Sequence, residues 1–148
     1  MKEKVKQWMK IARVQPSKEY VDLYMKLIEE EFNELKKAHE DNNYAEMVDA
    51  CIDLLWVTIG ELVSMQVDIS RAEEEVTRSN FSKYVRIKAS ALGAQELYKS
   101  KGIETYIDEV ELDGEKYYIV LRSTDNKILK PASYSPPDWS WLTPPDYF

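Results

Sequence analysis

The sequence predicts a mainly α-helical protein with a four-helix-bundle-type core, a small C-terminal β-hairpin region and an extended proline-rich tail. Apolar residues recur at intervals of three and four through the first half of the chain, which is the period of amphipathic helices. After Gly102 the period changes to alternation around an Asp-Gly pair, which is typical of a hairpin. From Pro131 onward, five prolines in 18 residues exclude a further helix.

Composition limits the class of molecule. The 148 residues, 44% hydrophobic and 32% charged, fit a folded globular protein with one core. No apolar stretch approaches the roughly 18 residues of a membrane span, and the N-terminus lacks the apolar core of a signal peptide, so we expect a cytoplasmic protein without a membrane partner. The net charge of −7 disfavours a nucleic-acid duplex as partner, because phosphate contacts need clustered Lys and Arg.

The expected elements follow one another with short breaks. A short amphipathic helix in residues 1–14 ends near Pro16, and a second starts at Ser17 or Lys18 and stops at residues 41–43. The third helix, residues 44–65, is apolar nearly all round after Asp53, so we expect it to be the most buried element. A fourth helix begins after Asp68, a good N-cap residue, and runs toward Ser79.

The C-terminal part has a different pattern. Residues 89–100 predict a short helix stopped by Gly102. Residues 105–112 and 117–122 flank Asp113-Gly114 and predict a β-hairpin with a type I′ turn, and residues 127–129 predict a third short strand. We therefore expect a helical domain over residues 1–100, and a hairpin and tail over residues 101–148 packed on that domain or on a neighbouring subunit. The tail aromatics are expected to lie against a surface.

Two pairs of acidic residues carry the candidate chemistry. Glu31 and Glu34 share a face of the second helix and interrupt its apolar stripe, and Glu46 and Asp49 repeat the spacing on the third helix, with Asp53 four positions further. Buried carboxylates repel each other, desolvation costs several kcal/mol per ion, and neither stripe holds a Lys or Arg. A hard cation such as Mg²⁺ would pair these charges and leave coordination positions for substrate phosphates.

Simpler explanations exist for some of these residues. The charge run around Glu29 is adequately explained as a solvated face, whereas the helical phase separates Glu31 and Glu34 from that run. Carboxylate ladders also bind metals in ferritin-like bundles, but those usually add a Glu-x-x-His motif, and the only histidine, His39, lies outside the pattern. The lone Cys51 lies in an apolar run and is expected to be a small buried residue rather than a catalytic thiol.

These motifs resemble a known superfamily. Glu31-x-x-Glu34 followed by Glu46-x-x-Asp49 is similar to the ExxE…ExxD signature of the MazG-like, all-α nucleoside triphosphate pyrophosphohydrolases. Residues 27–35, 49–60 and 78–83 resemble the phosphoribosyl-ATP pyrophosphohydrolase-like branch found in phages and bacteria. The resemblance covers residues 20–83, with a weaker echo in residues 127–131 and 134–137, and residues 84–126 match nothing that we can place.

The resemblance implies an all-α pyrophosphohydrolase core that cleaves a (deoxy)nucleoside triphosphate between the α- and β-phosphates. It implies that Mg²⁺, or Mn²⁺ as a substitute, is held by Glu31, Glu34, Glu46 and Asp49. Glu30 or Asp53 would supplement the metal shell or orient the attacking water. The residues that would bind phosphate oxygens are Arg78, Asn80, Lys83 and Lys130, although Arg78 and Lys83 also fit plain surface cations and Asn80 a helix C-cap. Trp56 is either a base-stacking residue or a core aromatic.

Two other functions stay open. One is hydrolysis of phosphoribosyl-ATP in histidine biosynthesis, although residues 49–53 depart from the acidic pair expected beside the final aspartate in that family. The other is a non-catalytic helical module whose acidic stripe stabilises an oligomer and whose Pro/Trp-rich tail docks a partner. Because so few helices cannot bury the third helix alone, we expect a homodimer or a dimer of dimers.

Overall fold

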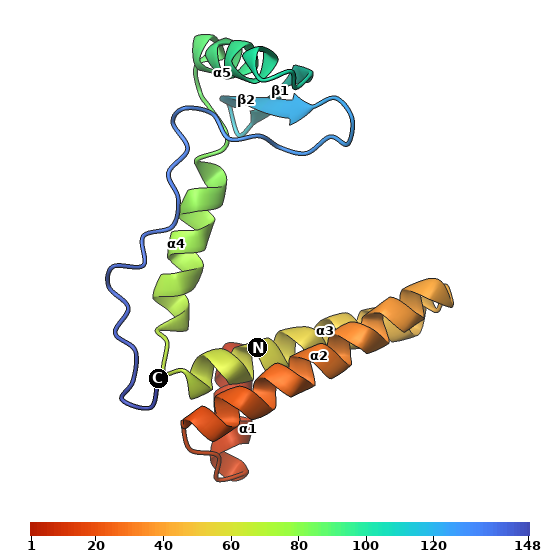
Figure 1. The fold of residues 1–148 in the computed structure, drawn as a ribbon, viewed down its shortest axis with the longest axis vertical. Helices are drawn as coiled ribbons and strands as arrows, with labels where there is room; N and C mark the ends of the chain where they lie inside the picture. Colours follow the sequence, from red (N-terminus) through yellow and green to blue (C-terminus); the bar gives the residue numbers. More distant parts are fainter. The chain divides into compact units, whose positions relative to one another are not determined.

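The computed structural model describes residues 1–148 and confirms a mainly helical chain with one small hairpin near the C-terminus. The elements are α1 (Lys2–Ile11), α2 (Lys18–Glu40), α3 (Tyr44–Ser64), α4 (Ile69–Phe81), α5 (Lys88–Ser100), β1 (Thr105–Leu112) and β2 (Glu115–Arg122) (Figure 1). None of the helices combines the length and the apolar content that crossing a membrane requires.

The chain divides into two compact units. The first holds Met1–Ile69 together with Trp141–Phe148, and the second holds Ser70–Ser140. The second unit includes α5 together with the hairpin, because Ala91 and Ala94 of α5 share one apolar cluster with Val120 of β2.

In the first unit, α2 and α3 form a helical hairpin that lies beside α1 (Figure 1). Local side chains set the helix ends. Ser17 Oγ accepts from the Tyr20 backbone N–H at 3.4 Å and caps α2, and Asn43 Oδ1 accepts from the Glu46 N–H at 3.3 Å and caps α3. The turn between them uses Asn42 at φ 52°, a conformation that asparagine tolerates better than most residues. The predicted break at residues 41–43 is therefore confirmed.

The core of the first unit is small. Val5 and Met9 of α1 pack with Tyr24 of α2 and Val57 of α3. Half-buried residues of α2, of α3 and of the loop after α1 extend this cluster, so α1 closes one side of the α2–α3 hairpin. The sequence predicted each of these helices within a few residues of its observed ends.

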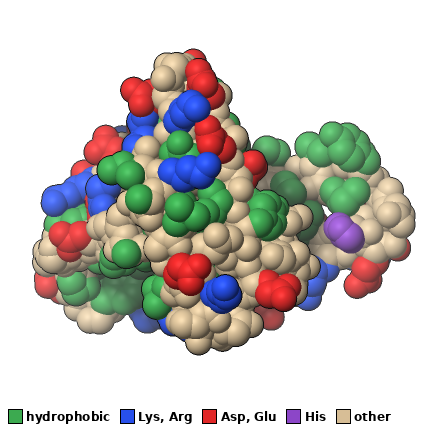
Figure 2. Space-filling model, turned by 90° about the horizontal axis from the view of Figure 1, so that it is seen from above, with side chains coloured by type: hydrophobic (Ala, Val, Ile, Leu, Met, Phe, Trp, Pro, Cys, Tyr) green, Lys and Arg blue, Asp and Glu red, His purple; other side chains and the backbone are tan.

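α3 has the smallest share of exposed residues among the five helices, yet one of its sides is open to solvent. One face of α3 is buried through Ala50, Val57, Gly60 and Ser64, but Val48 and Ile52 are exposed and Leu55 is 53% exposed. Cys51, predicted to be buried, is exposed on the same outward side. We call Val48, Cys51, Ile52 and Leu55 the outer α3 face; their spacing places them on one side of the helix. Exposed apolar side chains also appear among the charged groups in the space-filling view (Figure 2).

In the second unit, α5 covers one face of the β1–β2 hairpin. The strands pair antiparallel from Thr105 opposite Arg122 to Leu112 opposite Glu115. Asp113 at φ 53° and Gly114 at φ 78° form the turn, as a type I′ turn requires, so the predicted hairpin is confirmed. Gly102 at φ 72° follows the end of α5, as predicted.

The predicted third strand at residues 127–129 is reduced to an isolated bridge between Leu121 and Ile128. Two backbone hydrogen bonds form this bridge, from Leu129 N–H to the Val120 carbonyl at 2.8 Å and from Arg122 N–H to the Lys127 carbonyl at 2.9 Å. Pro131 follows closely and cannot donate a ladder hydrogen bond, which limits this strand.

The tail has no regular helix or strand, as expected. Its last residues lie against the first unit. Tyr147 donates its hydroxyl hydrogen to the Ser64 carbonyl at 2.5 Å, and Lys18 Nζ lies 5.6 Å from the centre of the Phe148 ring. Tyr147 is therefore fastened to the end of α3, whereas Phe148 stays 56% exposed.

Candidate active site

Six carboxylates project from the α2–α3 hairpin, and we call them the acidic ladder: Glu30, Glu31 and Glu34 on α2, with Glu46, Asp49 and Asp53 on α3. Glu34 and Glu46 line a common hollow of about 370 Å³ close to the turn between the helices. Further from the turn, Glu31 and Asp53 line a second cavity, of about 330 Å³. The two predicted acidic pairs therefore face each other across the hairpin.

Glu31 is the member of the acidic ladder with the most perturbed environment. Its side chain is half-buried. Burial raises the pKa of Glu31, and the negative charges of Glu34, Asp53, Glu30 and Asp49 raise it further, in that order. None of the ladder carboxylates forms an ion pair with a Lys or Arg. The ladder is therefore a concentration of negative charge without an ion pair, although Lys37 lines the same hollow as Glu34 and Glu46.

The ladder side chains are spread apart. No three His, Cys, Asp or Glu side chains are placed closely enough to hold a metal ion, and all ladder residues except Glu31 are exposed. The chemistry of the donor set nevertheless fits a hard cation such as Mg²⁺, because every donor is a carboxylate oxygen. Holding a cation requires rotamer changes that draw these exposed side chains together.

An apolar cavity adjoins the acidic ladder in the first unit. It is the cavity of about 330 Å³ that Glu31 and Asp53 line, and its other walls come from Trp8, Val14, Tyr20, Leu23, Tyr24, Leu27, Trp56 and Val57. We call it the aromatic cavity. Trp56 contacts the core cluster and also lines this cavity, and its ring meets Trp8 edge-to-face, with ring centres 6.4 Å apart. Trp8 was not among the predicted site residues; its place on an amphipathic helix gave no sign of this role.

Arg78, predicted to bind phosphate, is engaged within the second unit. Its Nε and Nη2 donate to the two carboxylate oxygens of Glu75 at 3.0 and 2.6 Å, and its guanidinium also donates to Ser135 Oγ and to the Pro136 carbonyl. Asp138 N–H donates to Glu75 at 2.6 Å. The hydrogen bonds from Arg78 and then from Asp138 lower the pKa of Glu75 to about 2. We call this arrangement the tail clasp, because it fastens the tail to α4.

The other predicted phosphate ligands gather near Tyr134, also in the second unit. Asn80 Oδ1 accepts from Lys83 Nζ at 2.7 Å, and Lys130 Nζ lies 4.3 Å from the centre of the Tyr134 ring. The hydrogen bond from Ser79 and the positive charges of Lys130 and Lys83 lower the pKa of Tyr134. Lys83 and Lys130 thus form a basic cluster beside Tyr134. Sequence reasoning missed Tyr134, although its segment carried the weak echo of the resemblance.

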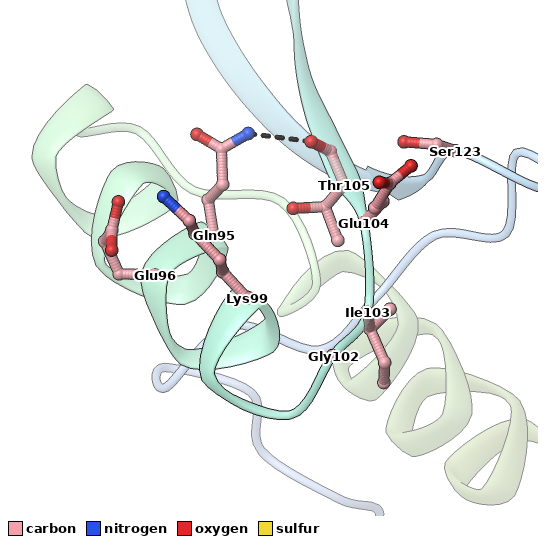
Figure 3. A pocket seen from close by; sticks show the side chains of 8 residues that line it. All are labelled: Gln95, Glu96, Lys99, Gly102, Ile103, Glu104, Thr105 and Ser123. Carbon is pink, nitrogen blue, oxygen red and sulfur yellow. Dashed lines mark hydrogen bonds between the residues drawn. The ribbon is translucent and has the colours of Figure 1, made fainter.

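A further cavity, of about 620 Å³, lies between the end of α5 and the start of β1 (Figure 3). Gln95 Nε2 donates to the Thr105 carbonyl at 2.9 Å across it. Lys99 lines this cavity together with two carboxylates, Glu96 of α5 and Glu104 of the following loop. None of the predicted site residues lines this cavity. Its lining holds both positive and negative side chains, so it does not indicate a particular class of ligand.

Facing carboxylate pairs on a helical hairpin are the arrangement that the resemblance to MazG-like, all-α nucleoside triphosphate pyrophosphohydrolases implies, and a family match shows membership of that superfamily. The sequence profile of the phosphoribosyl-ATP pyrophosphohydrolase family matches residues 5–80, just over half of the chain, and the chain belongs to this family. The resemblance drawn from the two acidic pairs is confirmed. The match includes the whole acidic ladder and ends before α5. No curated protein and no solved structure matches the chain.

Proposed function

We propose that the chain is a Mg²⁺-dependent nucleotide pyrophosphohydrolase that cleaves a (deoxy)nucleoside triphosphate between its α- and β-phosphates, giving a monophosphate and pyrophosphate. Family membership supports the general reaction class, which is hydrolysis of a pyrophosphate bond in a nucleotide. The observation that supports the metal is the acidic ladder, where a half-buried Glu31 meets four neighbouring carboxylates and no cation of the chain. Such charge is costly on packed helices, and a divalent cation is its natural partner.

The proposed roles follow the helix positions. Glu31, Glu34, Glu46 and Asp49 would hold Mg²⁺, with Mn²⁺ as a substitute. When bound, the cation would orient water and neutralise charge on the leaving pyrophosphate. Glu30 and Asp53 would supplement the shell or accept a hydrogen bond from the attacking water.

The phosphate-side residues lie in the second unit. Lys83, Lys130 and Asn80 would bind phosphate oxygens, since a basic cluster suits a polyphosphate. Arg78 would contribute only after exchanging Glu75 for phosphate, because its donors are engaged in the tail clasp. This makes Arg78 the weakest of the proposed phosphate ligands, and Lys83 and Lys130 the strongest.

Phosphoribosyl-ATP is the second candidate substrate, because the family carries that name. The sequence between Asp49 and Asp53 argues against this substrate. It consists of Ala50, Cys51 and Ile52, and so lacks the second acidic residue expected in that branch. A nucleotide-pool substrate is therefore our first choice, and both belong in the same assay.

We propose that the chain assembles as a homodimer or a dimer of dimers. The outer α3 face presents four apolar or thiol side chains at helical spacing, and it includes Leu55 at 53% exposure. Pairing this face with a second copy would remove it from water. A monomer in light scattering at micromolar concentration would contradict the assembly.

The deciding experiment is pyrophosphate release over a panel of nucleoside triphosphates, deoxynucleoside triphosphates and phosphoribosyl-ATP, with and without Mg²⁺. Glu34→Gln should lower turnover by roughly 100-fold, because it removes a ligand charge without changing shape. Glu29→Gln is the matched control, since Glu29 is exposed on the same helix and lies outside the acidic ladder. No turnover of any nucleotide, or equal activity of the two variants, would sink the proposal. Absent Mg²⁺ binding in calorimetry would instead favour the non-catalytic module.

A further inference from the structure

The β1–β2 hairpin of the second unit has one edge that the chain closes and one that it leaves open. β2 has neighbours on both sides, because β1 pairs along one edge while Val85 and Ile128 form short bridges to the other. β1 has a neighbour on one side only, since the sheet consists of these two strands. The second edge of β1 therefore carries backbone groups that no strand of the chain takes up.

The hydrogen-bond pattern of the hairpin shows which backbone groups point outward. Ser123 N–H donates to the Glu104 carbonyl at 3.0 Å, directly beside the first pair of the strands. Opposite residues of an antiparallel pair of strands alternate between bonded and non-bonded pairs, so the even-numbered residues of β1 bond to β2. The odd-numbered residues direct their N–H and C=O groups to the open edge. These residues are Thr105, Ile107, Glu109 and Glu111.

Only the start of this edge is blocked. Gln95 of α5 donates its side-chain amide to the Thr105 carbonyl at 2.9 Å, as expected for a carbonyl that points away from β2 (Figure 3). No backbone hydrogen bond outside the hairpin uses Ile107, Glu109 or Glu111. Natural edge strands are often kept from pairing by proline, lysine or a bulge. The eight residues of β1 contain none of these, so the edge is open to a further strand.

The side chains beside the open edge differ between the two faces of the hairpin. On the face that α5 covers, Ile107 packs against the core cluster of the second unit, and Glu109 and Glu111 follow it toward the turn. On the opposite face, Val110 is 40% exposed and Leu112 is 59% exposed. A strand added at this edge would therefore meet carboxylates on one face and apolar side chains on the other.

The charge of β1 argues against a second copy of β1 as that strand. Antiparallel pairing of two copies over most of their length would centre on Asp108 or Glu109 and set that carboxylate opposite itself. Like charges directly opposite each other destabilise a sheet. Lys116 of β2 pairs with Glu109 at 2.9 Å, whereas Asp108 and Glu111 form no ion pair within the chain. The charge of the edge is complementary to a basic strand.

We propose that the open edge of β1 docks an extended segment of another protein in which Lys or Arg alternates with apolar residues. The backbone groups of Ile107, Glu109 and Glu111 would bond to this segment and extend the sheet by one strand. Its basic side chains would lie on the face of Glu109 and Glu111, and its apolar side chains on the face of Val110 and Leu112. The interaction goes beyond the proposed nucleotide chemistry, and β1 lies outside residues 5–80, which the family match covers.

Amide exchange followed by NMR on the isotope-labelled chain tests strand addition directly. The probe is an end-blocked heptapeptide of alternating Lys and Val. Without it, the amides of Ile107, Glu109 and Glu111 should exchange fast, whereas those of Asp108 and Val110, which bond to β2, should exchange slowly. The probe should slow the first set. A heptapeptide of alternating Glu and Val is the control and should leave both sets unchanged.

Glu111→Pro is the central variant, because its missing N–H belongs to the open edge and the hydrogen bonds between β1 and β2 remain. It should raise the Kd of the Lys–Val peptide about tenfold, through the loss of one hydrogen bond. Glu111→Gln keeps the N–H and removes the charge, so it should raise this Kd about threefold. Glu96→Gln removes an exposed carboxylate of α5 away from the edge and should leave the Kd unchanged.

Several results would overturn the docking edge. Binding of the Lys–Val peptide without slower exchange at Ile107, Glu109 and Glu111 would indicate charge attraction without strand pairing. Equal affinity for the Lys–Val and Glu–Val peptides would remove the charge argument, and no binding at millimolar peptide would remove the site. Pyrophosphate release by Glu111→Pro should equal that of the parent, so the test of this edge and the test of the proposed reaction stay separate.

Discussion

Glu31→Gln removes one charge from the acidic ladder and keeps the shape of the side chain. Four carboxylates raise the pKa of Glu31 by their charge, namely Glu34, Asp53, Glu30 and Asp49. Repulsion between neighbouring like charges on helices costs about 0.2–0.5 kcal/mol per pair. Summed over the four neighbours and reduced for solvent screening, the variant should gain about 1 kcal/mol in the free energy of unfolding at pH 7 without metal. For a chain of this size that corresponds to a rise in Tm of about 2–4 °C.

In Mg²⁺ the parent should become more stable than Glu31→Gln, which reverses the order of stability expected without metal. A cation that binds only the folded chain stabilises it by about 2.7 kcal/mol at 100 times its Kd. The parent should gain this in millimolar Mg²⁺, and Glu31→Gln should gain much less, because it has lost a proposed ligand. Thermal unfolding followed by circular dichroism, in chelator and in Mg²⁺, measures both effects, with Glu29→Gln as the control. An unchanged Tm of Glu31→Gln in chelator would refute the repulsion argument, and a full Mg²⁺ response would remove Glu31 from the metal site.

Two further predictions concern the second unit. Because hydrogen bonds hold the pKa of Glu75 at about 2, below its ordinary 4.5, the tail clasp should be complete above pH 4.5 and lost as the pH falls toward 2. Glu75→Ala should release residues 131–138 at neutral pH, which amide exchange by NMR would detect, and continued protection would contradict the clasp. Gly102→Ala should destabilise the second unit by about 1 kcal/mol, because Gly102 has a positive φ. Gly93→Ala should stabilise it by a similar amount, because Gly93 lies inside α5 with open space around it. Urea unfolding should give opposite shifts in the midpoint, and equal shifts would contradict this reading.

The elements that the sequence predicted correctly are those with local signals. Ser17 and Asn43 cap the helices that follow them, and Asp113-Gly114 adopts the two positive φ angles of its turn type. Each signal needs only its neighbours in the chain, so one sequence was sufficient. Helical spacing likewise places each acidic pair on one face of its own helix, whereas the approach of the two pairs depends on how α2 packs against α3.

The features that the sequence did not predict depend on distant contacts. Periodicity identified the apolar residues of α3 but not which of them another element covers, so Cys51 and Leu55 were expected to be buried and are exposed. Arg78 resembled a phosphate ligand, yet its partners include Ser135 and Pro136, more than fifty positions away. The predicted third strand is reduced to a bridge for a related reason. Only Ile128 of this segment pairs with β2, and Pro131, which has no backbone N–H to donate, follows three residues later.

The outer α3 face lies next to the α3 members of the acidic ladder, Asp49 and Asp53, so assembly and metal binding should be coupled. Ile52 lies one residue from Asp53, and Val48 one residue from Asp49. Covering the outer α3 face with a second copy would exclude water next to these carboxylates, and a lower dielectric strengthens their attraction for a cation. Leu55→Glu adds a charge to the proposed interface without touching the ladder. It should shift the protein to monomer in light scattering and weaken Mg²⁺ binding in calorimetry severalfold, at unchanged helix content. A monomer that binds Mg²⁺ as tightly as the parent would show that the site is complete within one chain.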